Sequence, residues 1–567
     1  MCSHYIMAVM MNIYLHGSII SAICVAIMYV DEIKLKRGTK RYCTTLIRQS
    51  YRQGDKVLHR TVCNISKLPP QLIEQIRLGL RQGQAADQPA GPLQVERQRE
   101  YGASYALLNL ARQLELDRLI YSRKEPWRED ALALIVGRMV YQGSKLALTN
   151  VYADTALWEL CAHPAGQRPD VDRHAYAVMD RLMERQDAIQ KALARRHLHD
   201  GCLIYYDLTS SYFEGAYEDS DLVAFGHNRD GKKGHEQIAI GLLTDAQGCP
   251  VAVEVFRGNT SDQSTVLAQA QRLSQQYGVQ DVVFAGDRGM LTPKRIAEVS
   301  ALGFKTLTAL THPQIRSLLE RKVIQLELFD EREPVAVRDP EHKTLRYLLC
   351  KNPNTAADEH QTRQELIAQT RRALEKLAAS RKKRTQAELG AQVGAVLAKW
   401  RVAKFFAWRI EATRLVFEID QELVQAEEAL DGCYIIRTDV ADEVWNAQQA
   451  VDHYRGLAQV ERAFRNLKTV ALELRPVYHH TDDRIRAHVL ICMLAYYLQW
   501  HALQRLQPLF DADGDGKDRR WTWPIILERL KSIRTQTCRL GPTVLPQVIT
   551  RPDPEQQRIL DLLKVKL

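Results

Sequence analysis

Between residues 201 and 310 the apolar segments change type in a definite order, and this order constrains the fold more than any other feature of the sequence. Short runs of β-branched and aromatic residues bounded by turn residues are typical of strands, whereas apolar residues at helical spacing are typical of amphipathic helices. The segments are, in order, the strands Leu203–Thr209, Gln237–Leu243 and Val251–Phe256, the helix Ser264–Gln276, the strand Asp281–Ala285, the helix Pro293–Leu302 and the strand Lys305–Leu310. The order β-β-β-α-β-α-β predicts an α/β domain.

The rest of the chain differs in texture from this domain. The 567 residues, at about 150 per domain, suggest three to four domains. The segments that we predict are 1–27, an apolar extension; 28–92, a small β-rich segment and linker; 93–200, helical from Glu96 on; 201–310, the first part of the α/β core; 311–431, an insertion; 432–506, the second part of the core; and 507–567, a tail. The second part of the core includes a strongly apolar helix over Ile485–Leu506. The helical segment 93–200 is equally compatible with a DNA-end-binding domain and with a plain scaffold.

The first residues are unusual because no Lys, Arg, Asp or Glu occurs from Tyr5 to Val30. That length would span a bilayer, but Asn12 and His16 interrupt it, and neither a basic n-region nor a cleavage site is evident. Met28 begins a segment of ordinary soluble character. We therefore expect residues 1–27 to be dispensable or outside the native protein, and we expect no membrane partner.

Charge and cysteine content exclude some classes of protein. The net charge of +10, from 78 Lys and Arg against 68 Asp and Glu, permits nucleic-acid binding without establishing it. The 11 cysteines are scattered and form no CxxC pair, which argues against a zinc ribbon and against a disulfide framework. Free thiols fit a reducing compartment, and we expect a cytoplasmic protein.

Three acidic residues have settings suited to chemistry. Asp207 and Asp287 each lie at the end of an apolar strand, and Glu461 lies in a predicted helix from Glu443 to Lys468. Converging carboxylates repel one another unless a hard cation such as Mg²⁺ or Mn²⁺ neutralises them, and two such ions can promote phosphoryl transfer. Any one of these acids alone would more often be an ordinary strand-end or surface residue, so the prediction depends on all three.

The residues around Glu461 support this interpretation. Tyr454 and Lys468 lie seven residues on either side of it, and Arg465 is one turn further along, so all four would share one helix face. Basic and aromatic side chains beside a metal-binding carboxylate suit a phosphate backbone. The alternative is a Glu–Arg pair at the helix surface, which would mean little.

With these motifs the sequence resembles the insertion-sequence DDE transposases of the RNase H-like superfamily, in particular the branch with a Y-x2-R-x3-E-x6-K signature. Tyr454, Glu461 and Lys468 match the signature, while Leu457 occupies its Arg position, so Arg455 or Arg465 would supply that contact. The resemblance implies a mixed five-stranded sheet with flanking helices, interrupted by an insertion domain. It also implies a homodimer on DNA, and it makes Trp400 and Trp408 candidates for stacking on a flipped base, with core packing as the alternative.

The function that we predict is DNA transposition. The resemblance implies that Asp207, Asp287 and Glu461 hold two Mg²⁺ or Mn²⁺ ions for cleavage at the element ends and for strand transfer into target DNA. The predicted DNA contacts are Tyr454, Arg455, Arg465, Lys468, Arg288, His227 and Lys232. Two alternatives stay open: an RNase H-like nuclease without strand transfer, and a non-catalytic DNA-binding relic of the fold.

Overall fold

The computed structural model describes residues 28–37, 40–53, 56–81, 94–229, 231–232, 234–380, 382, 384–412, 414–470, 472–475, 477–513, 519–540 and 543–567. The apolar extension predicted at 1–27 lies outside these residues. The chain forms two compact units, one built from residues up to Arg97 together with Thr537–Val548, and the other from Gln98–Gln536 and Ile549–Leu567.

The first unit contains an antiparallel sheet of three strands among its described residues, β1 (Met28–Arg37), β2 (Lys40–Gln53) and β3 (Lys56–Asn64). Helix α2 (Pro70–Arg81) follows, with its proline in the first turn, where a missing N–H costs nothing. These three strands lie within the segment 28–92, for which we predicted a β-rich character. In the register, Met28 pairs with Gln49 and Leu46 pairs with Asn64.

The prediction that residues 93–200 are helical from Glu96 on is wrong for the first of these residues. Residues Gln94–Glu100 form strand β4, which pairs with β15 (Arg534–Leu540), and β15 also pairs with β16 (Thr543–Val544) and β17 (Val548–Ile549). Strand formation here depends on a partner more than 400 residues away in the sequence. A local pattern of charged residues cannot reveal such a partner, because strand propensity depends on its context.

The second unit is built on a mixed sheet, and its predicted segment order is confirmed. The described strands of this sheet number eight, in the order β10-β11-β14-β9-β8-β5-β6-β7. The elements that follow the predicted order are β5 (Cys202–Tyr212), β6 (Gln237–Asp245), β7 (Pro250–Arg257), α9 (Asp262–Arg272), β8 (Val282–Ala285), α10 (Pro293–Ala301) and β9 (Lys305–Ala309). Strands β5, β6 and β7 pair antiparallel, whereas β8 is parallel to both β5 and β9.

The prediction of five strands is too low for this sheet. Strands β10 (Val335–Arg338), β11 (Arg346–Lys351) and β14 (Cys433–Thr438) extend it through antiparallel pairing beyond β9. Two of these strands come from the segment that we predicted to be an insertion. The predicted boundaries at 311 and 431 therefore include residues that pair with the main sheet, because antiparallel edge pairing joins strands whatever their distance in sequence.

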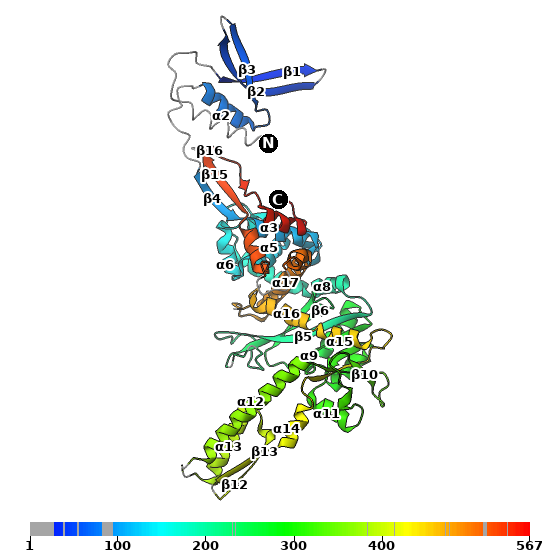
Figure 1. The fold of residues 1–567 in the computed structure, drawn as a ribbon. Helices are drawn as coiled ribbons and strands as arrows, with labels where there is room; N and C mark the ends of the chain where they lie inside the picture. Colours follow the sequence, from blue (N-terminus) through cyan, green and yellow to red (C-terminus); the bar gives the residue numbers. More distant parts are fainter. Residues whose placement is uncertain are drawn as a thin grey trace. The chain divides into compact units, whose positions relative to one another are not determined.

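The part of this segment that leaves the sheet has a small hydrophobic core of its own. It comprises α12 (Pro353–Ala378), α13 (Gln386–Trp400), the hairpin β12 (Phe406–Glu411) and β13 (Arg414–Ile419), and α14 (Gln421–Glu428) (Figure 1). Leu374 and Val393 are completely buried where α12 and α13 meet. Before it, α11 (His312–Glu320) precedes β10. The inserted part therefore folds on its own apolar residues and is joined to the sheet at β11 and β14.

Helices of the segment 93–200 pack with the sheet in one continuous hydrophobic core. These helices are α3 (Gly102–Gln113), α4 (Leu116–Ile120), α5 (Pro126–Tyr141), α6 (Lys145–Asn150), α7 (Leu157–Leu160) and α8 (Ala177–His197). Helix α17 (Asp482–Asp511), whose apolar character was predicted over Ile485–Leu506, lies against α5, α8 and β7 (Figure 1). Helices α18 (Trp523–Lys531) and α19 (Pro554–Leu562) complete the unit. A DNA-end-binding role for the helical segment stays a prediction.

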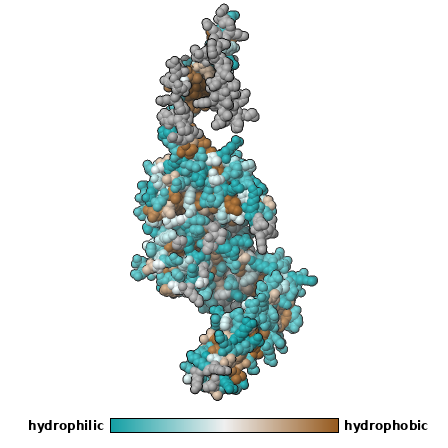
Figure 2. Space-filling model, turned by 60° about the vertical axis from the view of Figure 1, so that its left-hand side comes forward, coloured by the Kyte–Doolittle hydropathy of each residue, from teal (hydrophilic) through white to brown (hydrophobic). Residues whose placement is uncertain are grey.

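Hydrophilic residues predominate on one face of the second unit. On the face drawn in Figure 2, most described residues are hydrophilic and the apolar ones are scattered. Among the described helices, none combines the length and the apolar character needed to cross a membrane.

Candidate active site

Asp207 and Asp287 are brought together by the parallel pairing of β5 with β8. The last paired positions of these strands are Tyr205 and Ala285, and each aspartate lies two residues beyond its strand's position in this pair. Because side chains alternate between faces with a period of two, Asp207 points to the same face of the sheet as Tyr205. The register therefore places the two aspartates at corresponding positions just beyond the last paired residues of β5 and β8.

The prediction that Asp207 ends its strand is wrong in detail. Strand β5 continues to Tyr212, because Asp207 pairs with Leu242 of β6 and the antiparallel ladder runs on to Tyr212 and Gln237. Only the pairing with β8 stops before the aspartate. Asp207 is consequently half-buried within a strand, while Asp287 is exposed in the loop after β8.

Each aspartate is held by the backbone that follows it. The N–H of Leu208 donates to Oδ1 of Asp207 at 2.8 Å, and the N–H of Arg288 donates to Oδ1 of Asp287 at 2.7 Å. These hydrogen bonds occupy one oxygen of each carboxylate and limit its rotation. Both side chains are thus oriented before anything binds to them.

Glu461 reaches the same place from a helix pair. The structure replaces the predicted continuous helix over Glu443–Lys468 with α15 (Ala447–Arg455), a break at Gly456 and Leu457, α16 (Ala458–Arg465) and the π-helical turn η6 (Asn466–Val470). The break accommodates Tyr205, whose hydroxyl donates to the carbonyl of His453 at 2.7 Å. A Cβ at Gly456 would overlap that hydroxyl. Glycine is therefore required where the sheet and the helix pair meet.

A cavity of about 330 Å³ brings the three acids together. Its lining residues are Asp207, Asp287, Asn352, Tyr434, Tyr454, Arg455, Leu457, Ala458 and Glu461. The three carboxylates come from three separate elements, as the sequence predicted, and Tyr454 lies beside them despite the break in the helix. Leu457, at the signature's Arg position, also lines the cavity.

The pKa values of two lining residues reflect this crowding of acids. The pKa of Asp207 is raised to about 6, mainly by burial and also by the negative charges of Asp287 and Glu461, against the opposing effects of the Leu208 hydrogen bond and of the Arg229 guanidinium. Burial, with the charges of Asp287 and Glu461, also raises the pKa of Tyr454 to about 12. The cavity therefore favours a bound positive charge.

The other predicted DNA contacts are distributed around the cavity. Arg455 lines it and donates from Nη2 to the Tyr434 hydroxyl at 3.0 Å. Arg288 is exposed beside Asp287 and acts electrostatically on Tyr454. Arg465 is exposed at the end of α16 and Lys468 is half-buried in η6, and neither lines the cavity.

Two predicted contacts lie in the segment between β5 and β6. His227 and Lys232 are both exposed and do not line the cavity. The ammonium of Lys232 lies 5.7 Å from the centre of the Tyr212 ring. Neither residue lines the cavity or is among the groups that shift the pKa of Asp207, so the structure does not bring them to the three acids.

Three residues near the acids escaped the sequence analysis. Tyr434 comes from β14, and Asn352 caps α12 by accepting from the N–H groups of Asn354 and Thr355. Arg229 forms an ion pair with Asp262 and lies close enough to Asp207 to lower its pKa. The sequence Asn352-Pro353 at the start of a helical pattern is a recognisable N-cap signal, but nothing local indicates that this cap borders the site.

Two parts of the chain match known transposase families. Residues 216–498 match the model of the transposase DDE domain, and residues 31–92 match that of the IS1634 family transposase, N-terminal domain. Asp287 and Glu461 lie inside the first match, and Asp207 lies just before it. No curated protein matches this chain.

Solved structures offer only a distant likeness. A cryo-EM structure of piggyBac transposase in a synaptic complex with hairpin DNA covers 76% of this chain and 75% of that one, at 8% identity and a TM-score of 0.35. A likeness at this level carries no argument. The two family matches do, since together they cover more than half of the sequence and agree on one class. The chain belongs to the insertion-sequence DDE transposases.

Proposed function

We propose that this transposase cleaves DNA at the ends of its element and joins the cut ends to target DNA, with Asp207, Asp287 and Glu461 as the residues that hold two divalent ions. The observation that carries the proposal is the convergence of these three carboxylates from β5, the loop after β8 and α16 on one cavity. Acidic side chains with a purely structural role are ordinarily paired with basic side chains. Here they lie within each other's electrostatic influence.

The donor set fits a hard cation. All three groups offer carboxylate oxygens, which Mg²⁺ and Mn²⁺ prefer, and Asp207, with a pKa of about 6, is mostly ionised at neutral pH. When bound, two such ions activate an attacking oxygen and stabilise the leaving oxygen of a phosphodiester. The protein's own part is to hold Asp207 and Asp287 by their backbone hydrogen bonds and to bring Glu461 opposite them.

The five central strands support the assignment of the core as RNase H-like. Their spatial order is β7-β6-β5-β8-β9, with an antiparallel meander leading into two parallel strands. In this arrangement β5 and β8 are neighbours, which places the two aspartates together. Strands β14, β11 and β10 are then an extension of that core on the β9 side.

DNA would approach between the cavity and the inserted part. Asn352 lines the cavity at the start of α12, so the insertion begins beside the three acids. Trp408 on β12 is 41% exposed and available to stack on a base, whereas Trp400 packs against the insertion's own core. We propose that the protein acts as a homodimer in the cytoplasm. The remaining proposed DNA contacts are Tyr454, Arg455, Arg288, Arg465, Lys468, His227 and Lys232.

A joining assay tests this function. The purified chain is incubated with Mg²⁺, a labelled fragment spanning either border of its gene, and a supercoiled target plasmid. Cleavage at a defined position followed by covalent joining to the plasmid is the expected result. Cleavage without joining would favour the nuclease alternative, and binding without cleavage in Mg²⁺ or Mn²⁺ would favour the non-catalytic relic.

The acidity of Asp207 predicts a pH dependence. Cation binding needs the carboxylate, and its pKa is about 6, so the cleavage rate at limiting Mg²⁺ is expected to fall about tenfold per pH unit below 6. Removing the guanidinium in Arg229→Ala raises this pKa, which should move the fall to higher pH. Rates between pH 5 and 8 measure the shift. Arg257→Ala, an exposed arginine at the end of β7, is the control and should leave the profile in place.

A further inference from the structure

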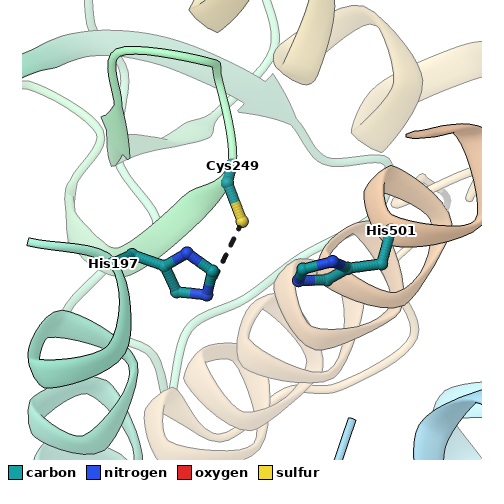
Figure 3. A group of neighbouring side chains, drawn as sticks. All are labelled: His197, Cys249 and His501. Atoms are coloured by element: carbon teal, nitrogen blue, oxygen red, sulfur yellow. Dashed lines mark hydrogen bonds between the residues drawn. The ribbon is translucent and has the colours of Figure 1, made fainter. Parts of the chain in front are cut away.

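A second cluster of ligand-type side chains lies apart from the carboxylate cavity (Figure 3). It consists of His197, the last residue of α8, Cys249, which directly precedes β7, and His501 on α17. One ligand atom of each residue lies within 4.8 Å of the others, and Figure 3 shows the two rings and the thiol converging from three elements. Cys249 is completely buried.

The hydrogen bonding of this cluster is incomplete. Nε2 of His501 is buried and has no hydrogen-bond partner among the described residues. The Cys249 thiol lies 4.0 Å from Nε2 of His197, at the outer limit for a bond to sulfur. A buried polar atom without a partner costs free energy, so its retention needs a reason.

A similar cluster elsewhere in the unit provides a contrast. Asp130 receives hydrogen bonds from both imidazoles of its group, one from His163 and one at 3.1 Å from His174. That group is satisfied by its own members, since each carboxylate oxygen has an imidazole. The members of the cluster at Cys249 do not satisfy one another in this way: Nε2 of His197 lies 3.1 Å from the Tyr497 hydroxyl, outside the cluster, and Nε2 of His501 has no partner among the described residues. A metal ion between the three side chains would be a common partner for them.

Asp245 lies behind two members of the cluster. Its Oδ1 accepts from the N–H of Cys249 at 2.9 Å, and its Oδ2 lies 3.7 Å from Nδ1 of His197. A carboxylate behind the far nitrogen of an imidazole is the usual support for a histidine that binds metal through its other nitrogen. Asp245 thus orients both the cysteine and the histidine.

We propose that His197, Cys249 and His501 form a Zn²⁺ site. One thiolate and two imidazoles bind Zn²⁺ in preference to the hard cations that are expected at the three acids. Three protein ligands leave one of four coordination positions for a solvent molecule. The proposal is independent of the transposase chemistry, because it shares no residue with the carboxylate cavity.

Protonation states and charge agree with this geometry. Burial lowers the pKa of His197 and of His501 to about 4, so both imidazoles are neutral and have a lone pair for metal at pH 7. Burial raises the pKa of the Cys249 thiol, so binding of Zn²⁺ forms the S–Zn bond as the thiol releases its proton to solvent. The thiolate and the Asp245 carboxylate then balance the two charges of the ion.

The proposed ion would brace the helix that carries Glu461. Gly248 adopts a positive φ of 82° in the turn before Cys249, and a Cβ there would lie 2.8 Å from the Cβ of Gln459 on α16. The turn is therefore packed against α16 two residues from Glu461. Joining this turn to α8 and α17 through a metal would fix the surface on which α16 rests.

Metal analysis of the full chain tests the site. The protein, freed of any affinity tag, is loaded with Zn²⁺, passed through gel filtration and analysed by mass spectrometry for bound zinc. We expect about one zinc per chain in the wild type and less than about a tenth of that in Cys249→Ser and in His501→Ala. Cys433→Ser removes another buried thiol, one that donates to the Ala429 carbonyl, and should retain the full amount.

Two readouts use the wild type alone and so do not depend on whether a variant folds. Loading with Co²⁺ should produce a thiolate-to-cobalt charge-transfer band, and removal of the metal by chelation should lower the unfolding temperature of the zinc-loaded wild type. Zinc content below a tenth per chain, equal zinc in all variants, or a cobalt spectrum without the thiolate band would each overturn the proposal.

Discussion

Replacing Asp207 with asparagine is expected to lower DNA cleavage by at least about 10³-fold while the metal-free protein stays as stable as the wild type. The amide removes a negatively charged ligand from the cavity, and loss of several kcal/mol of metal-assisted transition-state stabilisation corresponds to a factor of this size. Asp287→Asn and Glu461→Gln should behave alike. Single-turnover cleavage of border DNA in Mg²⁺ measures the effect.

Stability distinguishes this loss from misfolding. The pKa of Asp207 is raised to about 6 in the folded protein from an ordinary value of 3.8, so the unfolded chain loses this proton first as pH rises. The contribution of Asp207 to stability therefore falls between pH 3.8 and 6 and is a cost above pH 6. Asparagine cannot ionise, so in EDTA at pH 7.5 the variant should unfold at the same temperature or higher.

A matched control follows another strand of the same sheet. Asp439 follows β14 and accepts a hydrogen bond from the N–H of Thr306 at 2.6 Å, and burial raises its pKa as well. It does not line the cavity. Asp439→Asn should therefore retain cleavage within about tenfold of the wild type, since an amide oxygen can still accept that bond. A wild-type rate for Asp207→Asn would contradict the assignment of the site.

Gly456→Ala is expected to cause the second large effect. The added Cβ would overlap the hydroxyl of Tyr205, which is 2% exposed and bonded to the His453 carbonyl, so neither group can move freely. Overpacking of this kind costs about 1–3 kcal/mol. The break between α15 and α16 also sets the position of Tyr454 relative to Glu461. The cleavage rate should therefore fall by more than the loss of folded protein explains. Chemical unfolding and the cleavage rate measure the two effects.

The partner substitution separates overlap from backbone effects. Tyr205→Phe removes the oxygen that the added Cβ would meet first, and with it the hydrogen bond to His453, while the ring carbon Cζ stays 2.6 Å from that Cβ. The double variant Gly456→Ala with Tyr205→Phe should therefore recover part, but not all, of the stability lost by Gly456→Ala alone. The φ of Gly456 is −60°, which any residue adopts, so alanine introduces no backbone strain there. If strain were nevertheless the cause, Tyr205→Phe would restore no stability. A double variant as unstable as the sum of the two single variants would show that the contact is not the cause.

Local patterns were sufficient for part of the fold and of the site. The order β-β-β-α-β-α-β and the apolar helix over Ile485–Leu506 depend on side-chain periodicity, which is written in neighbouring residues. Asp207, Asp287 and Glu461 could be selected because each stands in a distinctive local setting. Patterns failed where pairing at a distance decides, as at Glu96–Glu100, which is a strand only because β15 lies beside it.

The sequence by itself singled out Asp207, Asp287 and Glu461 by their positions at strand ends and in a helix. It also indicated that the chain is a transposase. Only the tertiary structure decided that Asp207 and Asp287 lie two residues beyond the same paired position, that Asn352 and Tyr434 border them, and that His197, Cys249 and His501 meet. The physical reason is that strand register and helix packing depend on contacts between residues far apart in the chain, whereas helix and strand formation is governed largely by neighbours.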